Sequence, residues 1–260
     1  MTVHHINCGA LKSLPGDENP RSIVHCLLVE HGSRLLLVDS GFGLAEMRDP
    51  PGLLSREAVE FWGIAGGEQF TATREIERLG FDPAAVTDIV LTHGDVDHCG
   101  GLADFPLATV HISAEELAAL TGTRYVARQF AHGPRFHVYE SSSLRWHGLE
   151  ARRIQTGNGL AMHLVPLPGH TTGHCGVAIE QESGWLLHAG DSYYRRLELT
   201  DPEHPVAKIP MNFADDNAAR LRSLQLLRRL IAEQGEGLKV FSSHDVTEYQ
   251  GAANWPQAAA

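Results

Sequence analysis

The densest group of chemically useful side chains lies in residues 91–101, Leu-Thr-His-Gly-Asp-Val-Asp-His-Cys-Gly-Gly. His93, Asp95, Asp97 and His98 fall within a few positions, directly after an apolar run that is typical of a buried strand. Imidazole and carboxylate groups are the usual nitrogen and oxygen ligands of zinc, and they also suit iron and manganese. A solvated polar turn is the alternative, but so many ligand types after an apolar strand favour a metal site.

Three further polar residues follow apolar runs in the same way. His170 follows 161–166, Asp191 ends the sequence His-Ala-Gly-Asp after a Trp-Leu-Leu run, and His244 follows Lys-Val-Phe-Ser-Ser. Each one alone is a weak signal, because a single histidine after a strand is more often structural. Since residues that follow strands at one edge of a sheet gather around one site, we expect these three to join the cluster at 93–98.

These side chains must be positioned by strands and helices in alternation. Short apolar runs bounded by turn residues predict strands at 23–29, 34–39, 87–92, 108–112, 161–166, 175–180 and 184–189, with a last strand from Leu238. Helices are predicted at 71–80, from Ser113, where Ser-x-x-Glu fits a capping box, and from Asp215 or Asp216 to the glycines at 235 and 237. The last helix has a predicted apolar stripe of Leu221, Leu224, Leu227 and Ile231. This order predicts a mixed α/β class, with sheets covered by helices.

Composition limits the classes of partner. The chain has 260 residues with 21 basic and 32 acidic side chains, a formal net charge of −11, which argues against nucleic acid or an anionic membrane as a partner. There is no apolar run long enough to cross a membrane and no signal-peptide pattern at the N-terminus, so we expect a cytoplasmic protein with reduced cysteines. We predict one domain over residues 1–250, a poorly ordered tail over 251–260 and a small-molecule substrate, with a homodimer left open.

The combined motifs resemble the metallo-β-lactamase superfamily. The resemblance rests on His-x-Asp-x-Asp-His at 93–98, Gly-His-Thr-x-Gly-His at 169–174, Asp191 in Ala-Gly-Asp, and His244, with gaps of 72, 21 and 53 residues between the four groups. Leu-Val-Asp-Ser-Gly at 37–41 is similar to the family's Asp-Thr-Gly turn. The resemblance covers residues 23–245 and implies an αββα sandwich, in which two mixed sheets pack together, helices lie outside, and the site lies at one edge.

One position departs from the family's commonest motif, His-x-His-x-Asp-His. Asp95 takes the place of the second histidine. Because a carboxylate is a harder, anionic ligand, we expect the first metal position to lean further toward iron or manganese than an all-imidazole site would. The flavodiiron oxygen and nitric oxide reductases, a related branch, have Glu at this place.

The resemblance also implies how the ligands are shared. The first ion would take His93, Asp95 and His170, the second Asp97, His98 and His244, and Asp191 would bridge them. We therefore expect two divalent ions per chain, zinc first, with iron or manganese as alternatives. Two ions that share a water lower its pKa from about 15.7 toward 7, which activates the water for attack on a carbonyl or phosphoryl centre.

The same resemblance suggests catalytic roles for two side chains. Asp97 would orient the water and pass a proton to the leaving group. Tyr194, three residues after Asp191, matches a tyrosine of the N-acyl-homoserine lactonase branch that donates to the substrate oxygen, although a packing or surface tyrosine is equally consistent. His174 and His188, which flank the ligands, are interpreted as structural histidines, with support of the ligands from behind as the alternative.

The predicted function is therefore metal-dependent hydrolysis, most like the N-acyl-homoserine lactonase branch, with a lactone or other ester as substrate. Residues 42–70 are rich in apolar side chains, which indicates either ordinary helix packing or a cover over the site that would hold an acyl group. The alternatives are a phosphodiesterase acting on a small phosphodiester, a diiron oxidoreductase related to flavodiiron proteins, and a binding protein that keeps the fold without catalysis.

Overall fold

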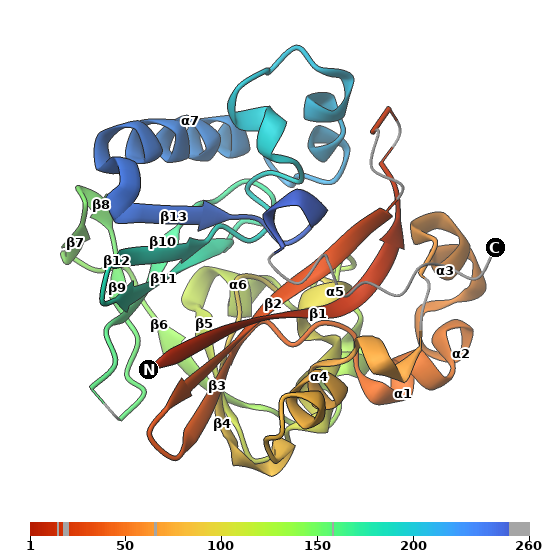
Figure 1. Cartoon of the computed structure of the whole chain (residues 1–260). Helices are drawn as coiled ribbons and strands as arrows, with labels where there is room; N and C mark the ends of the chain where they lie inside the picture. The colour runs from red at the N-terminus through yellow and green to blue at the C-terminus, as the bar shows by residue number, and fades with distance from the viewer. Residues whose placement is uncertain (15, 18–20, 65–66, 158, 250–260) are drawn as a thin grey trace.

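The structure is a computed structural model that describes residues 1–14, 16–17, 21–64, 67–157 and 159–249 (Figure 1). The tail predicted at 251–260 lies outside these residues. The strands are β1 (Thr2–Lys12), β2 (Arg21–His31), β3 (Arg34–Val38), β4 (Val86–Val90), β5 (Thr109–Ser113), β6 (Arg135–Tyr139), β7 (Arg145–Trp146), β8 (Leu149–Glu150), β9 (Arg152–Arg153), β10 (Met162–Pro166), β11 (Cys175–Gln181), β12 (Gly184–His188) and β13 (Leu238–Phe241). The helices are α1 (Leu44–Arg48), α2 (Pro50–Leu54), α3 (Arg56–Trp62), α4 (Ala72–Arg78), α5 (Val96–Cys99), α6 (Ala114–Ala119) and α7 (Asn217–Gln234).

Two mixed sheets form the centre of the molecule. The first has the order β1-β2-β3-β4-β5-β6, antiparallel through β3 and parallel from β3 to β6. The second has the order β13-β12-β11-β10-β9, antiparallel except for the parallel pair β12 and β13. In Figure 1, α7 covers the outer side of the second sheet and α4 that of the first.

Alternating side chains build three apolar layers. In β3, Leu36 and Val38 face the layer between the two sheets, whereas Leu35 and Leu37 face the layer under α4. In β11, Val177 and Ile179 join the layer between the sheets, and Ala178 faces α7. Since successive side chains of a strand point to opposite faces, strands that are apolar on both faces must be covered on both sides. The predicted αββα sandwich is therefore confirmed.

The apolar stripe predicted for α7 is wrong at one position. Leu224 and Leu227 are buried, but Leu221 is 49% exposed, and Arg220 takes the neighbouring buried position instead. Arg220 is accepted there because its guanidinium lies 3.5 Å from the buried carboxylate of Glu198. A charged pair inside the structure thus replaces the apolar residue that periodicity alone predicts.

The first strand was not predicted at all. β1 pairs with β2 along its length, with a register shift between Asn7 and Ala10. Its sequence mixes His, Asn and Gly with apolar residues, so it shows neither a continuous apolar run nor strict alternation.

Among the described residues, no helix is both long and apolar enough to span a bilayer.

Candidate metal centre

Every predicted ligand follows the carboxyl end of a strand. The segment after β4 carries His93 and Asp95, and the short helix α5 continues it with the next two ligands. The segments after β10, β12 and β13 carry His170, Asp191 and His244. Because β4 ends at Val90, the residues at 93, 95 and 97 converge through the turn and α5 rather than through strand alternation.

Glycines next to the ligands allow these segments to pack closely. Gly169 has φ +133°, and a Cβ there would lie 2.0 Å from the backbone nitrogen of Arg220 at the start of α7. Gly190 has φ +55°, and a Cβ would lie 2.5 Å from Nε2 of His174. Only glycine fits both the backbone conformation and the contact, so these positions fix where His170 and Asp191 lie.

The first ligand set is geometrically suited to a metal ion. Oδ2 of Asp95 lies 3.5 Å from Nε2 of His93 and 3.0 Å from Nε2 of His170. Oδ2 of Asp191 lies 3.4 Å from Nε2 of His170 and 4.0 Å from Nε2 of His93. A tetrahedral ion with bonds of about 2.1 Å would need ligand atoms about 3.4 Å apart, close to these separations.

The second set has similar dimensions. The Asp97 carboxylate lies 3.8 Å from Nε2 of His98 and 3.6 Å from Nε2 of His244. The two oxygens of Asp191 lie 3.3 Å from His98 and 3.1 Å from His244. Asp191 therefore contacts histidines of both sets, as the predicted bridging role requires. The structure brings all the predicted ligands together: His93, Asp95, Asp97, His98, His170, Asp191 and His244.

Buried atoms without partners show that this donor set fits metal ions. Nε2 of His93, Nε2 of His98 and Oδ1 of Asp191 are buried and have no hydrogen-bond partner among the described residues. An unsatisfied buried polar atom is costly, and a cation among these atoms would satisfy all of them. Nitrogen and carboxylate oxygen donors suit zinc, iron and manganese.

Electrostatics keep the central carboxylate ionised. Burial favours the neutral form of Asp191, but the imidazoles of His244, His98 and His170 hold its pKa well below the usual range. Burial likewise disfavours the charged form of His98, yet Asp191, Asp97 and Asp39 raise its pKa well above normal. The cluster therefore holds negative charge that a cation would neutralise.

Contacts behind the ligands fix their orientation. Nδ1 of His98 donates to Oδ2 of Asp39 over 2.8 Å, which directs Nε2 of the ring toward the second set. Nδ1 of His174 donates to the carbonyl of Leu167, and its Nε2 accepts from the backbone N–H of Asp191 over 2.9 Å. His188 donates to the carbonyl of His25 over 2.7 Å. His174 thus supports the segment of the ligand Asp191, whereas His188 has a structural role that connects β12 to β2.

Sequence reasoning assigned Glu116 to a capping box, but the structure uses it to join the ligand segments. Ser113 does cap α6, by accepting from the backbone N–H of Glu116. The buried Glu116 carboxylate accepts from the N–H of Gly94 over 2.8 Å, from the hydroxyl of Thr171 over 2.6 Å and from the N–H of Gly173 over 3.2 Å. It therefore connects the segment of His93 to that of His170.

Arg124 is a residue of the centre that sequence reasoning missed. Its Nε donates to Oδ1 of Asp95 over 2.6 Å, and its Nη2 donates to Oδ2 of the same carboxylate. Nη2 also lies 3.0 Å from Nε2 of His170. The one signal in the sequence was the unusual Asp95 itself, because a half-buried carboxylate in place of a neutral imidazole needs a cationic partner.

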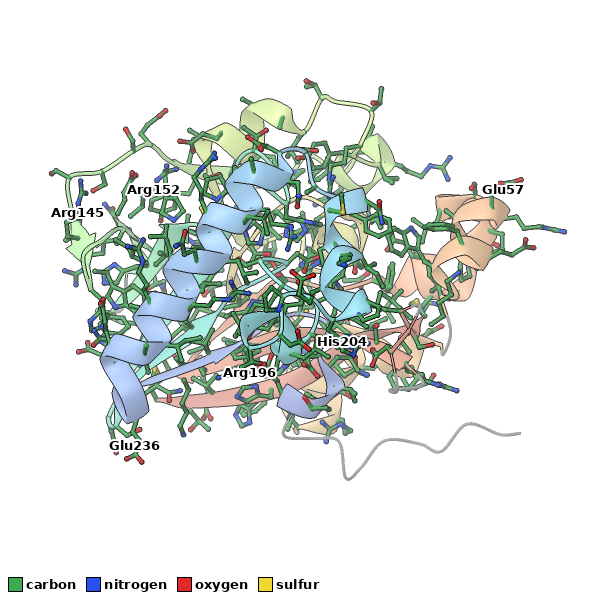
Figure 2. All side chains as sticks on the ribbon, turned by 90° about the horizontal axis from the view of Figure 1, so that it is seen from above. Glu57, Arg145, Arg152, Arg196, His204 and Glu236 are labelled. Atoms are coloured by element: carbon green, nitrogen blue, oxygen red, sulfur yellow. The ribbon has the colours of Figure 1, made fainter. Side chains whose placement is uncertain are left out.

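A cavity of about 820 Å³ opens on the centre. On one side it is lined by ligands of both sets, and Tyr194, buried and edge-on to His244 with ring centroids 5.2 Å apart, lies beside them. Trp62 of α3 and Phe213 both line the cavity, and their ring centroids lie 5.0 Å apart. In Figure 2 the segment that includes His204 lies between α7 and α3, which Glu57 marks. The apolar lining consists of Leu11, Leu14, Phe42, Phe61, Trp62, Val96, Ile209 and Phe213.

Comparison with known proteins places the chain in a family. The family profile described as "Metallo-beta-lactamase superfamily" matches residues 19–253. A probable metallo-hydrolase of Mycobacterium tuberculosis is 35% identical, over 96% of this chain and 82% of that protein. An N-acyl homoserine lactonase of Azorhizobium caulinodans is 27% identical, over 84% of this chain and 80% of its own length.

Solved structures share the fold. An N-acyl homoserine lactone hydrolase with the product N-hexanoyl-L-homoserine bound at its catalytic metal centre superposes with a TM-score of 0.72 at 20% identity, over 95% of this chain and 94% of that one. The dizinc quorum-quenching lactonase AidC gives a TM-score of 0.60 at 18% identity, over 86% and 73% of the two chains. The prediction of a metal-dependent hydrolase is confirmed at the level of enzyme class. The chain belongs to the metallo-beta-lactamase superfamily.

Proposed function

We propose that this protein hydrolyses lactones or related esters that carry an apolar acyl group, using two divalent metal ions, with zinc as the first candidate. The observation that carries the proposal is the cavity, whose apolar wall leads directly to the ligands of both sets. A carbonyl placed against the ligands leaves its acyl chain against Trp62 and Phe213. Apolar pockets with a few convergent polar groups are typical of small-molecule sites.

The bound ions would act as Lewis acids: they would lower the pKa of a water toward neutrality and would polarise the substrate oxygen. The protein's own residues do the rest. Asp97, half-buried at the cavity wall, accepts a hydrogen bond from the attacking water and passes a proton to the leaving oxygen. Tyr194 donates its phenolic hydrogen to the oxygen that becomes negative.

Burial supports the donor role of Tyr194. It raises the pKa of the phenol well above the normal value, and the nearby carboxylates of Asp191, Asp95 and Asp97 act in the same direction. A raised pKa favours the protonated phenol, which is the form that can donate a hydrogen bond. The apolar walls exclude bulk water, which strengthens such a hydrogen bond.

The relatives support the same substrate class. The lactonase of Azorhizobium caulinodans aligns over most of both chains, and the structural neighbours include hydrolases with an N-acyl homoserine product bound. The apolar wall of the cavity matches an acyl chain, whereas a small phosphodiester has no group that would use it. We keep the expectation of a cytoplasmic enzyme as part of this proposal.

The test combines metal content with a substrate panel. Protein purified without added metal is analysed for zinc, iron and manganese, and is then assayed on N-acyl homoserine lactones with short and long acyl chains, a simple aryl ester and an aryl phosphodiester. We expect about two equivalents of metal, preference for the long-chain lactone, and loss of activity on chelation or in Asp97→Asn. Activity confined to the phosphodiester, or oxygen-dependent redox spectra without hydrolysis, would overturn the proposal.

A further inference from the structure

The guanidinium of Arg124 lies against the first ligand set and pairs with one of its members, Asp95. Arg124 contacts both oxygens of Asp95, through Nε to Oδ1 over 2.6 Å and through Nη2 to Oδ2. The two side chains are only 24% and 18% exposed, so water screens their charges poorly. Bidentate pairs of arginine and carboxylate are among the stronger ion pairs in proteins.

The same guanidinium also engages a second ligand of this set. Nη2 of Arg124 also lies 3.0 Å from Nε2 of His170, and this imidazole nitrogen lies 3.0 Å from Oδ2 of Asp95. A neutral imidazole nitrogen has one lone pair in the plane of the ring. That lone pair accepts a hydrogen bond or binds a metal ion, but not both. In the observed arrangement, Arg124 therefore uses the atoms with which Asp95 and His170 would hold the first ion.

The second ligand set has no comparable competitor. Among the described residues, no arginine or lysine side chain forms a hydrogen bond or ion pair with the side chains of Asp97, His98 or His244. The polar contacts of these side chains go to Asp39, to Asp191, to the hydroxyl of Thr92, to each other and to the backbone carbonyl of Ile23. The two positions thus differ in one respect, the presence of a built-in cation.

Arg124 also has acceptors outside the centre. Its Nη1 donates to the carbonyl of Phe213 over 2.7 Å and to Oδ1 of Asp215 over 3.2 Å. Asp215 is 36% exposed and lies just before α7, where its backbone N–H donates to the carbonyl of His170 over 3.0 Å, while its carboxylate is not a member of either ligand set. A guanidinium that leaves Asp95 and His170 can keep these two contacts, so its displacement does not strand a buried charge.

We propose that Arg124 competes with the first metal ion for Asp95 and His170, so that the two positions fill in order: the second set binds tightly, and the first binds more weakly because Arg124 must be displaced. Asp95 makes this competition effective, since an imidazole at position 95 would not hold the guanidinium. The departure from the common family motif is then a device that sets the affinity of one metal position. This inference rests on the proposed two-ion centre.

The test measures metal binding and does not depend on turnover. Metal-stripped protein is titrated with Zn²⁺ in competition with a chromophoric chelator. For the wild type we expect two affinities that differ by about tenfold or more, in the range by which groups beside metal ligands tune affinity. In Arg124→Gln the weaker affinity should tighten by about tenfold while the tighter one stays constant.

Two further variants keep the test decisive. Arg128→Gln removes an arginine four residues along, which donates to the carbonyl of Gly52 outside the centre, and should leave both affinities unchanged. Asp95→His should also tighten the weaker position, and adding Arg124→Gln to it should give little further gain, because both changes remove the same competition. Thermal melts of the metal-stripped proteins show whether Arg124→Gln folds. If it folds poorly, Asp95→His still tests the competition, because it removes the carboxylate that holds Arg124.

The outcomes separate the two proposals. If wild type and Arg124→Gln each bind two ions with the same pair of affinities, or if Arg124→Gln weakens the first position, the competition is refuted while the two-ion centre stands. If no variant binds more than one ion, the two-ion centre itself fails, and the ordered loading fails with it. Hydrolysis of lactones is measured separately and decides neither result.

Discussion

Asp39 accepts a hydrogen bond from His98 over 2.8 Å, and this contact decides which ring nitrogen of His98 faces the ligands. The carboxylate also accepts from the backbone N–H and the hydroxyl of Thr92, each over 2.8 Å. It is fixed from two sides and completely buried. A carboxylate behind a metal-binding histidine orients the ring and raises its basicity.

Replacing Asp39 with alanine should therefore weaken the tighter metal affinity by about 10- to 100-fold. The measurement is the same chelator competition with Zn²⁺. Asp88→Ala is the matched control, because Asp88 holds His111 over an identical 2.8 Å but away from the centre. Equal metal affinity in wild type and Asp39→Ala would contradict the role assigned to this pair.

Glu116→Gln should destabilise the stripped protein by about 2–3 kcal/mol, since an amide cannot accept from all the donors that surround the carboxylate. Urea unfolding followed by circular dichroism measures this. The neighbouring Glu115→Gln weakens a bidentate pair with the buried Arg152, but Arg152 keeps Glu150 and the carbonyl of Tyr139 as acceptors, so the cost should be only about 1 kcal/mol. Similar costs for the two variants would show that Glu116 does not join the two ligand segments.

Tyr194→Phe should lower kcat for a lactone by about 100-fold, as expected when one donor to a developing oxyanion is lost. The metal content should not change, because the phenol is not among the ligands. Tyr193→Phe provides the comparison: its hydroxyl donates to Glu248, away from the cavity. A Tyr194→Phe enzyme with unchanged kcat would leave Tyr194 as a packing residue.

Trp62→Ala should raise KM for long-chain lactones by about tenfold and change it little for short-chain ones. The reason is that each buried methylene group contributes about 0.8 kcal/mol, and Trp62 lines the apolar wall next to Phe213. Steady-state kinetics on a chain-length series measures the effect. If KM rises equally for all chain lengths, the acyl group lies elsewhere in the cavity.

The pH dependence of stability should reveal Glu46. Burial raises its pKa to about 7 from 4.5. Between these values the folded protein holds a proton that the unfolded chain has lost, so stability falls as the pH rises from 4.5 to 7. Glutamine does not titrate, so the Glu46→Gln variant does not lose stability in this way. Its free energy of unfolding, measured relative to that of the wild type, should therefore rise by up to about 3 kcal/mol from pH 5 to pH 8.

Urea unfolding of the stripped proteins at the two pH values measures this difference, and titration of the metal ligands is common to both proteins and cancels. Glu57→Gln, at an exposed position of α3, should show no such trend. A constant difference between Glu46→Gln and wild type across the range would mean that Glu46 is ionised at low pH in the fold.

The ligand residues could be predicted because each one follows an apolar strand, and strand ends meet at one edge. Arg124 could not, because it lies outside any periodic element, and its partner Asp95 becomes its neighbour only through folding. For Glu116 the local pattern predicted the wrong contact. The Ser-x-x-Glu sequence of a capping box is the same whether the carboxylate binds the backbone at the start of its own helix or, as here, binds donors in other segments. Local patterns thus predicted the strands and helices that carry the ligands, whereas β1, with its mixed composition, and the long-range charge pairs required the structure.

Each ligand set draws on both sheets: the first joins His93 and Asp95 to His170, and the second joins Asp97 and His98 to His244. Neither sheet alone carries a complete set, so an ion at either position acts as a crosslink between the two halves of the sandwich. Since ions bind the folded chain and not its separated halves, binding adds directly to the free energy of folding. Scarcity of metal would then reduce the amount of folded protein as well as its activity.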